Sequence, residues 1–179
     1  MTTFNELSAG TWTLDPAHSE VEFTVRHAGI SKVRGTFQEV SAELNVGEQS
    51  SVTASANIAS LDSGNADRDG HVKGADFFDA ENYPTMTFTS TSIESDGEDF
   101  TLNGDLTIKD ETRPVSFKGE FGGVAVDPFG ATRAGFSAST SISRKDFGMT
   151  WNAALETGGV LVSDKVNISL EVSFIAPQA

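Results

Sequence analysis

The 179-residue sequence predicts an all-β fold, an antiparallel barrel or sandwich of about eight strands. Three observations predict it. Apolar and polar residues alternate with a period of two in several segments. Turn-forming residues separate these segments, and windows that favour a helix are scarce. The length suits one domain, which we place at residues 10–175, after a disordered tail at residues 1–9.

The first clear strand follows this tail. Val21, Phe23, Val25 and His27 alternate with charged or polar residues, so one face is apolar and the other is charged. Asp96-Gly97 is the strongest hairpin signal in the chain, because Asp-Gly favours the tight turns that join antiparallel strands. The same alternation recurs at residues 52–58, 102–108, 136–142 and 166–172.

Residues 65–84 break the alternation. They contain several Asp and Asn residues that can cap a helix, and their apolar residues do not follow a period of two. We expect a short helix near Asp69 to Phe77, ended by Pro84 at the latest.

The same region matches a calcium-loop pattern in part. Asn65, Asp67, Asp69, Gly70 and Asp76 occupy its positions one, three, five, six and twelve. However, position one is Asn, position twelve is Asp in place of Glu, and the preceding segment is a predicted strand, not a helix. A calcium-stabilised interaction module is therefore a minor alternative, and a helix-capping loop is the favoured interpretation.

Charge and composition exclude several classes. The formal net charge is −14, which predicts repulsion from nucleic acids and from anionic membranes. The absence of Cys excludes disulfides and thiolate metal sites. Apolar stretches are too short to span a bilayer, and no secretory signal is visible, so we expect a cytoplasmic protein without an integral membrane segment.

Catalytic and metal-binding motifs have little support. The three histidines do not form a zinc-binding pattern, and we interpret His27 as a barrel-lining or rim residue. Ser137 lies within an alternating strand, where it is expected to face solvent, and no phosphate-binding glycine motif is present. We therefore expect no catalytic residues, no metal site and no resident cofactor.

The aromatic residues are the most informative feature. There are 13 Phe and only 1 Tyr, so most aromatic surface has no polar group and needs a dry environment. These side chains could fill an ordinary core, or they could line a barrel that holds an apolar ligand. Their spacing leaves both possibilities open.

Four blocks of residues, in order, resemble the YceI-like family of bacterial polyisoprenoid-binding proteins. The first runs from Trp12 through His18 to Phe37, and the second from Asp67 to Ser90. The third is Gly104–Ile108 with Val115, and the fourth is Ser143–Met149 with Gly158–Val160. The match extends from about Gly10 to Phe174, so it is specific as a set.

The resemblance implies an elongated, lipocalin-like antiparallel β-barrel with one short helix in a long connection. It implies non-catalytic binding, storage or transport of a long isoprenoid amphiphile: a polyprenol, a polyprenyl phosphate or an isoprenoid quinone. An enzyme acting on an apolar lipid is the alternative, and a homodimer is possible because edge strands and a ligand mouth need covering. We expect the lumen to be lined by Phe23, Val25, His27, Phe37, Phe88, Leu106, Phe136, Ile142, Phe147 and Trp151, with polar contacts at its rim from Arg68, His71 and Arg144.

Overall fold

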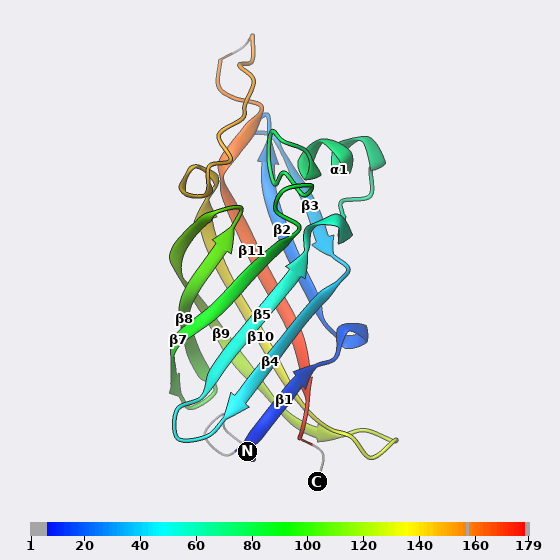
Figure 1. The fold of residues 1–179 in the computed structure, drawn as a ribbon, viewed down its shortest axis with the longest axis vertical. Helices are drawn as coiled ribbons and strands as arrows, with labels where there is room; N and C mark the ends of the chain where they lie inside the picture. Colours follow the sequence, from blue (N-terminus) through cyan, green and yellow to red (C-terminus); the bar gives the residue numbers. More distant parts are fainter. Residues whose placement is uncertain (1–6, 157, 178–179) are drawn as a thin grey trace.

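The computed structural model describes residues 7–156 and 158–177, which form an elongated, closed barrel of eight antiparallel strands with one α-helix (Figure 1). The helix lies near one end of the long axis, here called the helix end. Both termini lie at the other, here called the terminal end. The strands are β1 (Gly10–Leu14), β2 (Glu20–His27), β3 (Ser31–Phe37), β4 (Val40–Val46), β5 (Ser51–Asn57), β6 (Leu61–Asp62), β7 (Thr85–Asp96), β8 (Asp99–Ile108), β9 (Glu111–Val126), β10 (Thr132–Ser143) and β11 (Val162–Ile175).

The barrel closes through the order β1-β4-β5-β7-β8-β9-β10-β11, with β11 pairing back to β1. β11 has two partners on that side. Its end near Phe174 pairs with β1, and its preceding part, from Val162 to Glu171, pairs with β2. β3 extends this second region, and only its last two residues pair with β6. The wall is therefore continuous at the terminal end, whereas β3 presents an unpaired edge toward the helix end.

Most of the strand predictions are confirmed. The predicted hairpin at Asp96-Gly97 joins β7 to β8, with Asp96 opposite Asp99 and Gly97 in the left-handed region that glycine tolerates. The segments at 20–27, 102–108, 136–142 and 166–172 all lie within strands. The segment at 52–58 is β5 up to Asn57, and Ile58 begins the 3-10 turn η3 (Ile58–Ser60).

The helix starts earlier than the sequence predicts. α1 spans Ala66–Lys73, not Asp69 to Phe77. Asn65 is its N-cap, because its side-chain oxygen accepts a hydrogen bond from Arg68 N at 3.0 Å. Asp69 lies inside the helix, where its buried carboxylate accepts from Ser63 N at 3.0 Å and from the Ser63 hydroxyl.

The predicted tail at residues 1–9 is only partly within the described residues. Leu7 is buried in a cluster with Trp12, Leu14 and Phe174 toward the terminal end. Trp12 is almost fully buried, and its Nε1 donates to Ser8 O at 2.9 Å. The packed chain therefore begins ahead of Gly10, and residues 1–6 lie outside the description. No helix in the described ranges is long and apolar enough to cross a membrane.

Candidate lipid-binding cavities

The barrel interior contains two cavities. The inner cavity has a volume of about 160 Å³, and the mouth cavity, toward the helix end, has a volume of about 500 Å³. Val21, Met86 and Ile168 line both, so the two cavities meet at these side chains. Together they form an interior that runs along the barrel from the mouth toward the terminal end.

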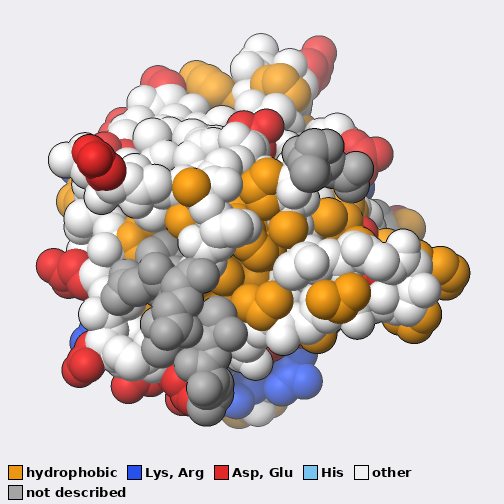
Figure 2. Space-filling model, turned by 90° about the horizontal axis from the view of Figure 1, so that it is seen from below, with side chains coloured by type: hydrophobic (Ala, Val, Ile, Leu, Met, Phe, Trp, Pro, Cys, Tyr) orange, Lys and Arg blue, Asp and Glu red, His pale blue; other side chains and the backbone are white. Residues whose placement is uncertain are grey.

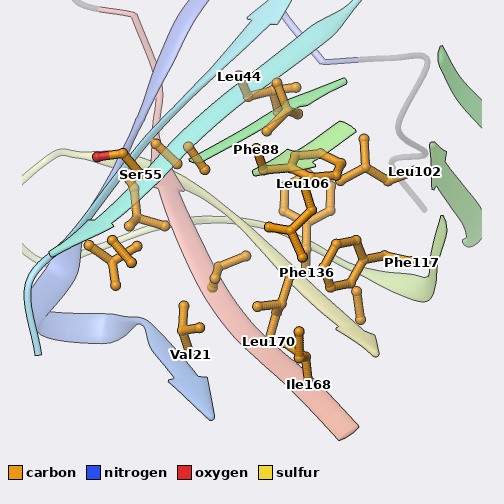
Figure 3. A pocket seen from close by; sticks show the side chains of 18 of the residues that line it. Val21, Leu44, Ser55, Phe88, Leu102, Leu106, Phe117, Phe136, Ile168 and Leu170 are labelled. Carbon is orange, nitrogen blue, oxygen red and sulfur yellow. The ribbon is translucent and has the colours of Figure 1, made fainter. Parts of the chain in front are cut away.

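The inner cavity is lined almost entirely by carbon. In Figure 3, Phe88, Leu106, Phe117, Phe136 and Leu170 point inward from different strands of the wall. Of the described residues that line it, Ser55 and Thr87 alone are polar, and the Ser55 hydroxyl lies 3.5 Å from Ser41 Oγ, which is not part of the lining. No titratable side chain lines this cavity in the described ranges, so the cavity suits a hydrocarbon chain.

Phenylalanine rings narrow the interior toward the terminal end. The Phe136 ring lies 5.1 Å from the Phe121 ring, and 5.8 Å from the rings of both Phe100 and Phe174. Offset and edge-to-face contacts at these distances are favourable. Phe136 thus belongs both to the buried core and to the cavity lining.

Two phenylalanines lie against the barrel wall because glycines make room for them. A Cβ atom at Gly35 would stand 2.3 Å from Phe23 Cζ, and one at Gly104 would stand 2.4 Å from Phe88 Cζ. Only glycine permits a ring to lie this close to a neighbouring strand. The rings therefore cover the wall and leave the centre of the barrel open.

The mouth cavity adds polar groups. Arg26, His27, Asp67, Arg68 and His71 are all exposed and contribute to its lining. Because these residues come from β2 on one side and α1 on the other, the cavity reaches the surface between those two elements. An amphiphile in the barrel would thus have its polar end here and its apolar end in the inner cavity.

An aromatic cluster connects α1 with the loop 148–161. The His71 ring lies 4.7 Å from the Trp151 ring and 5.2 Å from the Phe77 ring. His71 Nε2 is also 3.0 Å from a carboxylate oxygen of Asp76. All three rings line the mouth cavity, so they form part of its cover at the helix end.

Hydrogen bonds from Arg144 hold the loop 148–161 in place. Arg144 is only 5% exposed, and its guanidinium donates to the carbonyl oxygens of Met149, Trp151, Val162 and Ser163 at 2.8 to 3.2 Å. It also lies 5.6 Å from the centre of the Phe77 ring. Burial lowers the pKa of Arg144, and the nearby charge of Asp164 partly offsets this. An arginine remains charged even so. Arg144 is therefore a cation at the border of the cavity that no carboxylate of residues 7–156 or 158–177 bonds directly.

The structure brings most of the predicted site residues together. The mouth cavity is lined by Phe23, Val25, His27, Phe37, Ile142, Trp151, Arg68, His71 and Arg144, and the inner cavity by Phe88, Leu106 and Phe136. Phe147 is the exception. It lies in the 3-10 turn η4 (Arg144–Phe147), outside the alternation of β10, and is buried in the core with Ile108 and Phe117. It lines neither cavity.

Sequence reasoning missed the residues where the two cavities meet. Met86 and Ile168 occupy alternating inward positions of β7 and β11. The alternation of 166–172 was sufficient to find Ile168. Met86 follows closely after Pro84, and this proline marks a turn in the sequence, so the alternation that would assign Met86 to an inward face is not apparent there.

The calcium pattern does not correspond to a loop. Its residues fall on the N-cap, body and C-terminal flank of α1, where Asn65 caps the helix and Asp69 accepts from Ser63. Within the described residues, no three His, Asp or Glu side chains are grouped as metal ligands would be.

A family model described as the YceI-like domain matches residues 12–174. The chain belongs to the YceI-like family. A UPF0312 protein of Staphylococcus epidermidis is 37% identical over 165 residues, covering 89% of this chain and 94% of that protein. Protein YceI of Escherichia coli O17:K52:H18 is 39% identical over 134 residues, covering 73% of this chain and 70% of its own.

Solved structures share the fold. BcnA of Burkholderia cenocepacia superposes with a TM-score of 0.77 at 25% identity, covering 89% of this chain and 98% of BcnA. The YCEI protein of Campylobacter jejuni gives 0.74 at 32% identity, covering 86% and 90%. A polyisoprenoid-binding domain of Saccharophagus degradans, implicated in plant cell wall breakdown, gives 0.72 at 16% identity, covering 93% and 98%. These solved structures and this chain therefore share one fold.

Proposed function

We propose that this protein binds a long isoprenoid amphiphile in the barrel without chemically changing it, and stores or transports it. The observation that carries the proposal is the gradient of polarity along the interior. An almost entirely apolar inner cavity continues into a mouth cavity bordered by arginine and histidine side chains. The naming of the Saccharophagus degradans domain as polyisoprenoid-binding supports the same ligand class.

Burial of the tail supplies the affinity. One isoprene unit has five carbons, so its transfer from water contributes about 4 kcal/mol before costs are subtracted, at ~0.8 kcal/mol per CH₂. Ordering a flexible chain and fixing the complex in space oppose this gain. Several buried units exceed those costs, so the tail determines affinity and the head group determines which end remains at the mouth.

Polyprenols, polyprenyl phosphates and isoprenoid quinones share this tail. An uncharged head group agrees with the acidic character of the protein, since its net charge of −14 disfavours anionic ligands at long range. The local cations Arg68 and Arg144 act in the opposite direction at the mouth.

The test is organic extraction of the purified protein, followed by mass spectrometry of the extract. The proposal predicts a prenyl lipid from the wild type and its loss from folded Phe23→Asp and Phe136→Asp variants, because each replaces a ring against the tail with a charge that hydrocarbon does not solvate. Ser139→Asp is the matched control, since Ser139 is exposed on the outer face of β10. Prenyl lipid retained by both lumen variants would contradict the proposal.

A further inference from the structure

The charges of this protein are unevenly distributed along the barrel. Acidic residues occupy the turns at the terminal end, including Glu48, Asp96, Glu98 and Asp127, and acidic side chains surround that end in Figure 2. The basic residues gather instead in the half of the barrel that holds the mouth cavity: Arg26, Lys32, Arg34, Arg68, Lys73, Lys109, Arg113, Arg144, Lys145 and Lys165. Acidic residues such as Asp67, Asp76, Asp110 and Asp146 lie in this half too, so its charges largely cancel, and the excess of negative charge lies mainly toward the terminal end.

The hairpin of β2 and β3 carries the most concentrated positive charge. Arg26 lies directly opposite Lys32, and Arg34 lies opposite Thr24, so both arginines and the lysine share the outer face. All three are exposed. Like charges in directly opposite positions destabilise a strand pair, so this arrangement has an energetic cost that folding alone does not explain.

Among the described residues, one weak ion pair opposes the positive charge of the hairpin. Glu22 reaches Arg34 only at 4.0 Å, and that arginine side chain is 67% exposed, which makes the pair weak. Asp164 lies in the neighbouring bulge of β11, but it accepts hydrogen bonds from the Ser143 hydroxyl and from Lys145 N. Asp67 is exposed across the mouth on α1.

Apolar side chains extend from the end of this hairpin. Ile30, in the turn between β2 and β3, is 86% exposed, and Val160 is 50% exposed. Ala28 N donates to Leu161 O at 2.6 Å, which ties the turn to the segment that carries Val160. Exposed aliphatic residues flanked by cations are typical of surfaces that bind the interface of a lipid bilayer.

This surface adjoins the entrance to the barrel. His27, at the end of β2, lines the mouth cavity and pairs with Ser31 at the start of β3. In the part of the chain that the structure describes, β3 pairs only with β2 from Ser31 to Gly35, so its other edge faces the opening toward α1. Basic residues on an edge strand also block unwanted strand pairing. That role does not require Arg26 to oppose Lys32, or Ile30 to be exposed.

We propose that the β2–β3 hairpin docks on the surface of a bilayer that contains anionic lipids, and thereby presents the mouth cavity to the membrane. Arg26, Lys32 and Arg34 contact the head groups, and Ile30 enters the interface. The acidic terminal end does not prevent this. β9 has 16 residues and extends about 50 Å, whereas charges are screened over about 8 Å at physiological ionic strength. Repulsion of the terminal end also orients the helix end toward the membrane.

The test is co-flotation of the purified protein with vesicles of phosphatidylcholine, with and without phosphatidylglycerol. The wild type should float with the anionic vesicles, and added salt should release it. Lys32→Ser and Arg26→Ser should each lower the partition coefficient about fivefold, since one basic residue near an anionic surface contributes about that factor. Ile30→Ser should lower it as well.

Matched controls lie away from the hairpin. Lys118 is exposed on the outer face of β9, and Phe129 is 95% exposed in the β9–β10 turn. Lys118→Ser and Phe129→Ser should bind vesicles as the wild type does. Wild-type protein that ignores anionic vesicles, or binding that depends on Phe129 and not on the hairpin, would overturn the proposal. A hairpin variant that changes the oligomeric state but keeps vesicle binding would do the same, because it would assign the surface to a second copy of the chain.

Docking and lipid binding are measured separately. Extracted lipid content reports on the lumen, whereas flotation reports on the hairpin. The Lys32→Ser and Ile30→Ser variants should keep their lipid, because neither residue lines a cavity. Failure of docking then leaves the lumen assignment intact, and loss of lipid from lumen variants leaves docking intact.

Discussion

The Gly35→Ala substitution is expected to push the Phe23 ring into the mouth cavity and so reduce the volume of that cavity. A Cβ atom at this position would stand 2.3 Å from Phe23 Cζ and 2.6 Å from Cε1 of the same ring, whereas ordinary contact begins at about 3.4 Å. The ring must therefore move by about 1 Å or more. Phe37 lies 5.8 Å away on one side, and the mouth cavity is the open direction. We expect the Phe23 ring to enter the cavity.

The cost should appear in ligand binding more than in stability. Moving a ring off its preferred rotamer costs about 0.5–1.5 kcal/mol, which lowers the melting temperature by about 1–6 °C for a domain of this size. Displacing two or three methylene groups of a bound tail costs about 2 kcal/mol, which is roughly 30-fold in affinity. Titration with a fluorescent polyprenol measures the affinity, and thermal unfolding followed by circular dichroism measures the stability.

Two controls isolate the effect. Gly47→Ala introduces the same methyl group where no atom lies within 4 Å, and should leave affinity unchanged. Phe23→Leu shortens the ring, so the double variant Gly35→Ala/Phe23→Leu should bind like Phe23→Leu alone, since the two positions are coupled. A folded Gly35→Ala variant with wild-type affinity would refute the assignment of Phe23 to the lumen.

Four further predictions follow from other parts of the structure. Arg144→Met should lower the free energy of unfolding by more than about 3 kcal/mol in urea titrations, because four carbonyl oxygens lose a charged donor. A smaller loss would show that the loop 148–161 does not depend on Arg144. Trp151→Ala should raise the release rate of the fluorescent polyprenol about tenfold, because the His71 and Phe77 rings lose their aromatic partner, and an unchanged rate would argue against a cover at this point. Hydrogen bonds from His18 and Arg133 hold the pKa of Asp15 below its ordinary value, and Arg133 does the same for the pKa of Asp127. The stabilisation from these carboxylates is therefore complete above about pH 4 and is lost as the pH falls through the lowered pKa values. In urea titrations at several pH values, the free energy of unfolding should depend less on acid pH for Arg133→Gln than for the wild type, and an equal dependence in both proteins would contradict this. EDTA and calcium should leave the melting temperature unchanged, because Asn65 and Asp69 are engaged within α1 and its preceding turn, whereas a rise with calcium would restore the metal hypothesis.

The strands could be predicted because alternation reports directly on which face is buried. Val21, Phe23 and Val25 line the cavities as the period of two requires. Closure of the sheet could not be read from the chain, because the pairing of β1 with β11 joins residues more than 150 positions apart. The open interior depends on Gly35 and Gly104, whose function becomes apparent only when their partner rings are placed.

The surroundings of Arg144 and Phe147 could not be predicted from the sequence, for a physical reason. Arg144 was expected at the rim, yet it is buried and bonded to four carbonyl groups, which depends on how the loop 148–161 folds back on it. Phe147 follows an alternating strand but lies in a 3-10 turn, so it turns into the core. Arg144 still lines the mouth cavity, so only Phe147 lies outside the expected lining. The burial of Arg144 and the position of Phe147 both arise where the chain leaves regular structure and sequence periodicity no longer applies.

The most direct test of lipid binding in the lumen is photo-crosslinking with a polyprenol that carries a photoreactive group at the end of its tail, followed by mass spectrometry of the labelled peptides. We predict labels on residues of the inner cavity, such as Leu106, Phe136 and Leu170, which a folded Phe136→Asp variant should lose. Labels confined to exposed side chains on the outer surface would contradict the account.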